Sequence, residues 1–121
     1  MFNFEKLETW QEAIAFADQV YELTSEFPND ERFGLTNQMR RAAVSVEANI
    51  VEGFALGTVG LIRRHLRIAI GSAAETECLL NLAAEREYLA KPVAAPLLKT
   101  VDSTLALLTG LYRSPRLARN R

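Results

Sequence analysis

Arginines form the most suggestive chemical pattern in this chain. Arg63, Arg64 and Arg67 fall within about a turn and a half of a predicted helix, and no acidic residue occurs between Gly53 and Ala74. Guanidinium groups collected in this way attract the phosphates of nucleic acids. The candidate nucleic-acid-binding residues are these three and six others: Arg113, Arg116, Arg119, Arg121, Arg40 and Arg41. The alternative is that the run faces solvent or forms salt bridges with acidic residues near the N-terminus.

A row of polar residues is expected on the helix that covers residues 35–54. Gln38, Ser45, Asn49 and Glu52 are seven, four and three residues apart, which places them within roughly 60° of one another on a helix. Such a row beside an apolar face favours a hydrogen-bonded seam with a neighbouring helix. A ligand-binding site is the alternative interpretation.

Two carboxylates interrupt the apolar stripes of the following helix. Glu75 and Glu77 are costly at apolar positions unless they are paired, and Arg40 or Arg41 of the preceding helix is a suitable partner. The alternative is that both glutamates lie at the rim and reach water. A paired-carboxylate active site would require a cleft, which a small filled bundle rarely has.

The one histidine and the one cysteine lack the neighbours that catalysis or metal binding requires. His65 lies among arginines, which disfavour a bound cation, so we expect a surface histidine. Cys78 lies in an apolar stretch with no histidine nearby in sequence, which predicts an inert, partly buried thiol. A single cysteine also excludes a disulfide within the chain and a cysteine-based zinc site. The sequence therefore predicts no metal, no cofactor and no enzymatic activity.

Length and composition are those of one globular domain. The 121 residues are 49% hydrophobic and 24% charged, which suits a folded core. The formal net charge is −1, yet residues 1–31 carry eight acids against one lysine, and residues 32–74 carry six arginines against two glutamates. No stretch approaches the ~20 apolar residues that span a bilayer, and no signal peptide is recognisable, so we expect a cytoplasmic protein without membrane contact.

Four helices are predicted to position these residues. Apolar residues recur with the 3.6-residue helical period almost from end to end, and the alternation typical of strands is absent. The helices are expected at about residues 7–26, 35–54, 58–87 and 92–112, and the basic tail 113–121 is expected to be mobile. Connections of roughly three to eight residues favour a single all-α domain, an antiparallel up-down-up-down four-helix bundle.

The two central helices are apolar on more than one side. Val44 and Val51 lie about 120° or more from the core stripe of their helix. The next helix has a second stripe made of Leu61, Ile68, Leu79 and Leu82. One bundle core does not cover both sides, so we expect a homo-oligomer.

Residues 33–53, FGLTNQMRRAAVSVEANIVEG, resemble the signature of the four-helix bundle family first described as the 23S ribosomal RNA intervening-sequence protein. Residues 4–28 resemble the first helix of that family and residues 66–89 its third, whereas the fourth helix is matched weakly. The positions that match the family pattern are Leu35, Thr36, Gln38, Arg40, Arg41, Ala42, Ala43, Ser45, Asn49, Ile50, Glu52, Gly53, Ala69, Gly71, Ser72 and Glu75.

The resemblance implies a bacterial, cytoplasmic bundle that assembles into a homo-oligomer, typically a homopentameric ring. The same family includes the accessory protein of diversity-generating retroelements, which associates with a reverse transcriptase and nucleic acid. The matched positions look structural, and the resemblance implies no enzymatic activity. We therefore expect a non-catalytic oligomeric interaction module that binds RNA, DNA or a nucleic-acid-handling protein through basic patches. The alternative is a structural or protein-partner scaffold without affinity for nucleic acid.

Overall fold

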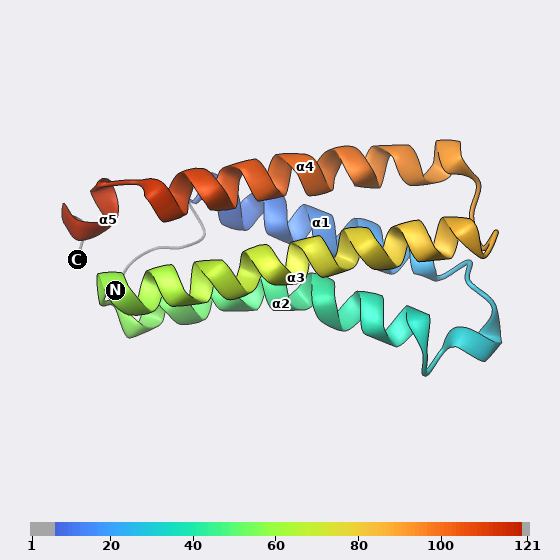
Figure 1. Ribbon diagram of the computed structural model, residues 1–121. Helices are drawn as coiled ribbons and strands as arrows, with labels where there is room; N and C mark the ends of the chain where they lie inside the picture. The colour runs from blue at the N-terminus through green and yellow to red at the C-terminus, as the bar shows by residue number, and fades with distance from the viewer. Residues whose placement is uncertain (1–6, 120–121) are drawn as a thin grey trace.

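The computed structural model describes the backbone of residues 7–119 and the side chains of residues 7–117. The elements are α1 (Glu8–Thr24), a short 3₁₀ helix η2 (Asn29–Glu31), α2 (Leu35–Leu56), α3 (Val59–Glu85), α4 (Lys91–Arg113) and α5 (Arg116–Arg119) (Figure 1). No strand occurs within the described residues. The predicted all-α, single-domain four-helix bundle is confirmed.

Each long helix packs against the next along the chain, and α4 returns to pack against α1. The most extensive contact joins α2 and α3. In Figure 1 the start of α3, the end of α4 and α5 lie at the same end of the bundle, because consecutive helices run in opposite directions. This topology brings residues near position 63 beside residues near position 112.

The sharp reversal between α2 and α3 follows from two residues. Gly57 ends α2 in the left-handed conformation, with φ of 82°, and its amide donates to the Gly53 carbonyl at 3.1 Å. A glycine adopts this conformation without the steric penalty that a Cβ would add. Thr58 then caps α3, because its hydroxyl accepts a hydrogen bond from the Leu61 amide at 3.3 Å.

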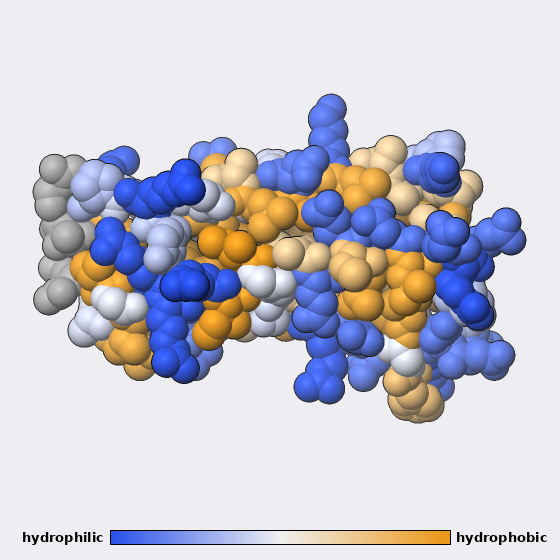
Figure 2. Space-filling model, in the orientation of Figure 1, coloured by the Kyte–Doolittle hydropathy of each residue, from blue (hydrophilic) through white to orange (hydrophobic). Residues whose placement is uncertain are grey.

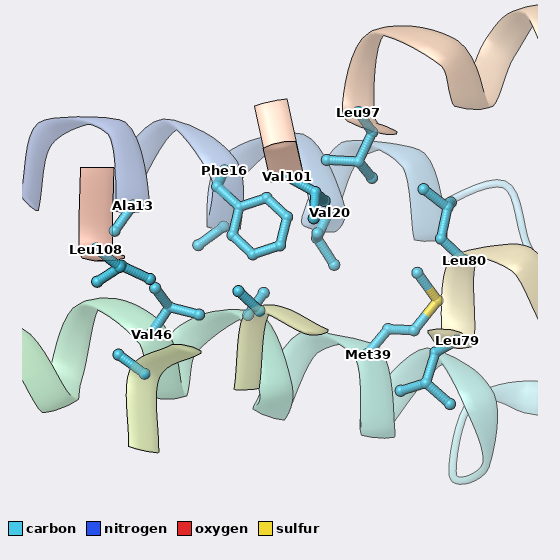
Figure 3. Packing of buried hydrophobic residues seen from close by; sticks show 14 of the residues in the cluster. Ala13, Phe16, Val20, Met39, Val46, Leu79, Leu80, Leu97, Val101 and Leu108 are labelled. Carbon is cyan, nitrogen blue, oxygen red and sulfur yellow. The ribbon is translucent and has the colours of Figure 1, made fainter. Parts of the chain in front are cut away.

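The core is formed by the inward stripes of all four long helices (Figure 3). Phe16 points from α1 into the middle of the bundle, and Met39 and Val46 of α2 point back toward it. All three side chains are fully buried. The periodicity of apolar residues is therefore explained by burial against neighbouring helices.

One sequence-based expectation about the apolar residues of α3 is corrected. Leu79 was predicted on the second stripe of its helix, but it is buried in the core cluster with Met39. It lies at the edge of that stripe, and contact with two neighbouring helices widens the buried arc of α3. The other three members of that stripe remain between 37% and 48% exposed: Leu61, Ile68 and Leu82. Val44, on the second apolar side of α2, is 37% exposed.

Part of the basic tail forms regular structure that its sequence does not predict. Residues 116–119 form α5, and Leu117 is buried with only 4% of its surface exposed. One apolar residue is enough to attach the segment to the bundle, although a single residue creates no periodic signal. Separately, no helix in the described part of the chain has the length and apolar character to cross a membrane.

Candidate nucleic-acid interface

The start of α3 and the end of α4 bring two basic segments together. The Nε of Arg63 donates a hydrogen bond to the Tyr112 carbonyl at 3.2 Å, across 49 positions of sequence. Neither residues 53–74 nor residues 103–121 contain an acidic residue. We refer to the resulting cluster as the basic end; its described members are Arg63, Arg64, Arg67, Arg113 and Arg116.

The arginines of α3 line a shallow surface groove within the basic end. Gly60, Ile68 and Tyr112 complete the groove, so apolar surface lies between the cations. Figure 2 shows strongly hydrophilic side chains gathered where α3 begins and α4 ends, with hydrophobic surface between them. An extended polyanion would meet several guanidinium groups at once on such a surface.

The alternative of salt bridges to the acidic first segment does not match the packing. Helix α1 packs against α2 and α4. No ion pair joins Arg63, Arg64 or Arg67 to a carboxylate within the described residues. Arg64 and Arg67 are exposed, so their charges face solvent. Of the predicted tail residues, Arg119 belongs to α5 without a described side chain, and Arg121 lies outside the described residues.

Arg40 and Arg41 do not belong to the basic end. The Arg40 guanidinium donates to the Thr24 hydroxyl at 2.9 Å and to the Tyr21 carbonyl at 3.2 Å, and lies 4.6 Å from the centre of the Tyr21 ring. Arg40 therefore attaches α2 to the end of α1. Arg41 is exposed and lines a separate groove beside Glu75.

The expected pairing of Arg40 or Arg41 with Glu75 or Glu77 is not formed in the described structure. Arg40 lies on the side of α2 that faces α1, so it points away from α3. Glu75 instead accepts a hydrogen bond from the Gln38 amide at 3.4 Å. An amide and a carboxylate thus meet where the sequence suggested an ion pair.

The polar row on α2 lies along its contact with α3. Ser72 of α3 donates to the Ser45 hydroxyl at 2.9 Å, and the Asn49 amide donates to the Ser45 carbonyl at 2.8 Å. The Oδ1 of Asn49 is 2.9 Å from Nδ1 of His65, and Glu52 approaches the same nitrogen at 3.9 Å. Gln38, Ser45 and Asn49 therefore form hydrogen bonds with side chains of α3, and Glu52 lies beside His65, so the row is a polar seam between the two helices.

The prediction of a surface histidine is wrong, because His65 is only 8% exposed. It lies where α2 and α3 approach closely: a Cβ built on Gly53 would lie 2.9 Å from the His65 Cβ. Since the Asn49 amide nitrogen donates to Ser45, its Oδ1 is free to accept the Nδ1 proton of His65. The arginines around His65 in sequence point elsewhere, since adjacent helical residues are about 100° apart.

Cys78 and Gly71 lie on the outward side of α3. The Cys78 thiol is exposed, which corrects the prediction of a partly buried residue. Gly71 is also exposed, and a Cβ built there would meet nothing within 4 Å. Neither residue is required by packing within the bundle that the structure describes.

A contact that the sequence did not suggest joins η2 to the turn after α3. The Tyr88 hydroxyl donates to the Glu31 carboxylate at 2.7 Å, and the Leu35 amide donates to the same carboxylate at 3.1 Å. The Tyr88 bond first, and the Leu35 bond second, favour the charged form and lower the pKa of Glu31. The contact closes the end of the bundle opposite the basic end.

Replacement of Tyr88 by phenylalanine is expected to return the pKa of Glu31 toward its ordinary value of 4.5. Because folding lowers this pKa, the contact stabilises the protein above about pH 4.5, and the stabilisation disappears as the pH falls through the folded-state value. As the pH falls through that window, the free energy of unfolding of the variant should therefore decrease less than that of the parent protein. Carboxyl-carbon NMR titration of Glu31 measures the shift, and an unchanged pKa would contradict the assignment.

The structure defines a class of protein: a small antiparallel four-helix bundle with a polar seam between two helices and a cluster of arginines at one end. Within residues 7–119, no three histidine, cysteine, aspartate or glutamate side chains are grouped so as to hold a metal ion. The chain belongs to the 23S rRNA-intervening sequence protein family, whose model matches residues 5–110.

A similar solved structure is that of a protein of unknown function from the S23 ribosomal protein family of Bacteroides thetaiotaomicron. The two chains are 23% identical and superpose with a TM-score of 0.81, over 88% of this chain and 96% of the other. At this identity the similarity establishes the fold. No curated protein matches the chain in sequence.

Proposed function

We propose that this protein is a non-catalytic interaction module, assembled as a homo-oligomer, that binds the phosphate backbone of RNA or DNA at the basic end. The observation that carries this proposal is the juxtaposition of two acid-free, arginine-rich segments from α3 and α4. Phosphate contacts of this kind position a polyanion without reading its sequence. The function is therefore backbone binding with little sequence preference.

The exposed apolar residues of α2 and α3 support assembly. Val44, Leu61 and Ile68 lie outside the core and remain accessible to solvent. Contact with further copies of the chain would cover this surface. A closed ring, with five subunits as the family resemblance implies, would repeat the basic end by symmetry and strengthen its field. The net charge of −1 does not oppose local binding, because eight of the fifteen acidic residues lie within residues 1–31 and none lies in residues 53–74 or 103–121.

The basic end is tested by reversing two of its charges, Arg64→Glu together with Arg67→Glu. We expect the affinity for single-stranded and duplex oligonucleotides to fall roughly tenfold or more at low salt. The slope of log affinity against log salt concentration should also decrease by the amount that corresponds to about two phosphate contacts. Fluorescence anisotropy over a series of salt concentrations measures both quantities, with RNA and DNA of the same sequence.

The matched control reverses two other cations, Lys91→Glu together with Lys99→Glu. Both lysines are exposed on the first half of α4, away from the basic end, and the change in net charge is the same. Affinity should change by less than about twofold. An equal loss of affinity in the control variant would contradict a localised site, as would an affinity that does not change with salt concentration.

Assembly is tested by light scattering, in which a monodisperse monomer would contradict the oligomer.

Material that co-purifies with the protein separates the two candidate functions. Nuclease-sensitive absorbance at 260 nm supports binding of nucleic acid. A single stoichiometric protein partner without nucleic acid supports the scaffold alternative.

A further inference from the structure

A further groove lies between the last turns of α1 and the first turns of α4, at the end of the bundle away from the basic end. Its volume is about 610 Å³, within the size range of small-molecule sites. Apolar side chains from both helices and from the turn before α4 line it: Leu23, Leu89, Val93 and Leu97. Val93 is 57% exposed, so hydrophobic surface is accessible at the mouth of the groove.

One of the residues that line this groove carries a buried acceptor without a donor. The Oε1 atom of Gln19 is buried and has no hydrogen-bond partner among the described residues. A buried acceptor left unpaired is costly, and a bound donor would remove that cost. The Ser25 hydroxyl also lines the groove, but it already donates to the Glu22 carbonyl at 2.6 Å.

The charge at the groove has one sign. The side chains of Glu22 and Glu26 lie at its rim, and neither forms an ion pair within the described residues. No lysine or arginine is among the residues that line the groove. An anion would be repelled here, whereas a cation would gain two neighbouring carboxylates.

We propose that this groove binds a small organic cation, a compact apolar body that carries one amine or amidine group. The apolar body packs against Leu23, Val93 and Leu97, and the nitrogen lies beside the carboxylates of Glu22 and Glu26. Rotation of the buried Gln19 side chain would then bring its unpaired Oε1 to the nitrogen as an acceptor. The site shares no residue with the basic end. Its failure would therefore leave the proposed nucleic-acid function untouched.

The first test compares three probes of similar size by ¹⁵N–¹H NMR titration of the full chain. We expect 2-phenylethylamine to cause saturable shifts around Val93 and Leu97, with an affinity of about millimolar order. The neutral 2-phenylethanol should bind about tenfold more weakly, and 3-phenylpropanoate should cause no saturable shift. Equal responses to the amine and the alcohol would overturn the proposal.

The second test uses variants. Glu22→Gln and Glu26→Gln should each weaken amine binding about threefold or more, whereas Asp18→Asn, the same charge change on α1 outside the groove, should not. Gln19→Leu should weaken binding and also raise the denaturation midpoint of the ligand-free protein, since it removes the unpaired acceptor.

Two further outcomes would overturn the proposal. Loss of binding in Asp18→Asn equal to that in the groove variants would show a general attraction of cations to α1. Binding of an arginine-containing apolar peptide without any response to the amine would show a protein-docking surface.

Discussion

Replacement of Phe16 by alanine is expected to lower the free energy of unfolding by about 3–5 kcal/mol. Phe16 is fully buried at the centre of the bundle, where side chains of the other helices surround it (Figure 3). Alanine removes the ring and leaves a cavity, because the four helices can close the space only in part. The loss is large against the roughly 5–15 kcal/mol that stabilises a typical domain.

Urea denaturation followed by circular dichroism measures this loss. The matched control is Phe33→Ala, since Phe33 is 87% exposed at the turn before α2. The control should change stability by less than about 0.5 kcal/mol. A loss below about 1 kcal/mol for the Phe16 variant would contradict the central position of its ring.

The second large effect is expected at Gly53, where α2 and α3 approach each other. In Gly53→Ala the new Cβ would lie 2.9 Å from the His65 Cβ and 3.3 Å from the Ile62 Cα. These atoms belong to or adjoin the backbone, so the helices must separate and strain the Asn49–His65 hydrogen bond. We expect a net destabilisation of about 1–3 kcal/mol, even though alanine favours a helix over glycine by about 1 kcal/mol.

Gly71→Ala is the matched control for Gly53→Ala. Both glycines are inside helices, but a Cβ at Gly71 meets nothing within 4 Å. This variant should therefore gain about 0.5–1 kcal/mol from helix propensity. Opposite signs for the two variants support the close approach at Gly53, and two stabilised variants would contradict it. Destabilisation at Gly71 would indicate that a neighbouring copy covers the outer side of α3.

The helices could be predicted from the sequence because their signals are local. Apolar periodicity, the Gly57–Thr58 reversal and Pro92 near the start of α4 all act within a few residues. The structure places the ends of the four long helices within two residues of the predicted ones. Leu117 shows the limit of this approach, since a single apolar residue in a basic tail has no period.

The candidate sites could be predicted only in part. The Arg63–Arg67 run was visible because its members are close in sequence, whereas its contact with the end of α4 depends on a pairing 49 residues apart. The small-cation groove had no signal in the sequence, since Gln19 and Val93 come from helices at opposite ends of the chain. Arg40 was assigned the wrong partner because periodicity does not say which neighbouring helix a half-buried position faces.

The sequence by itself determined the class of fold, the presence of the arginine run and the polar row on α2, because each depends on the spacing of residues along one helix. Only the tertiary structure decided that His65 is buried and that the two basic segments share one end. Both outcomes depend on how closely and in which direction two helices pack. That packing depends on which positions lack a side chain and so let two backbones come close, as Gly53 does, and no pattern within a single helix records which helix lies opposite.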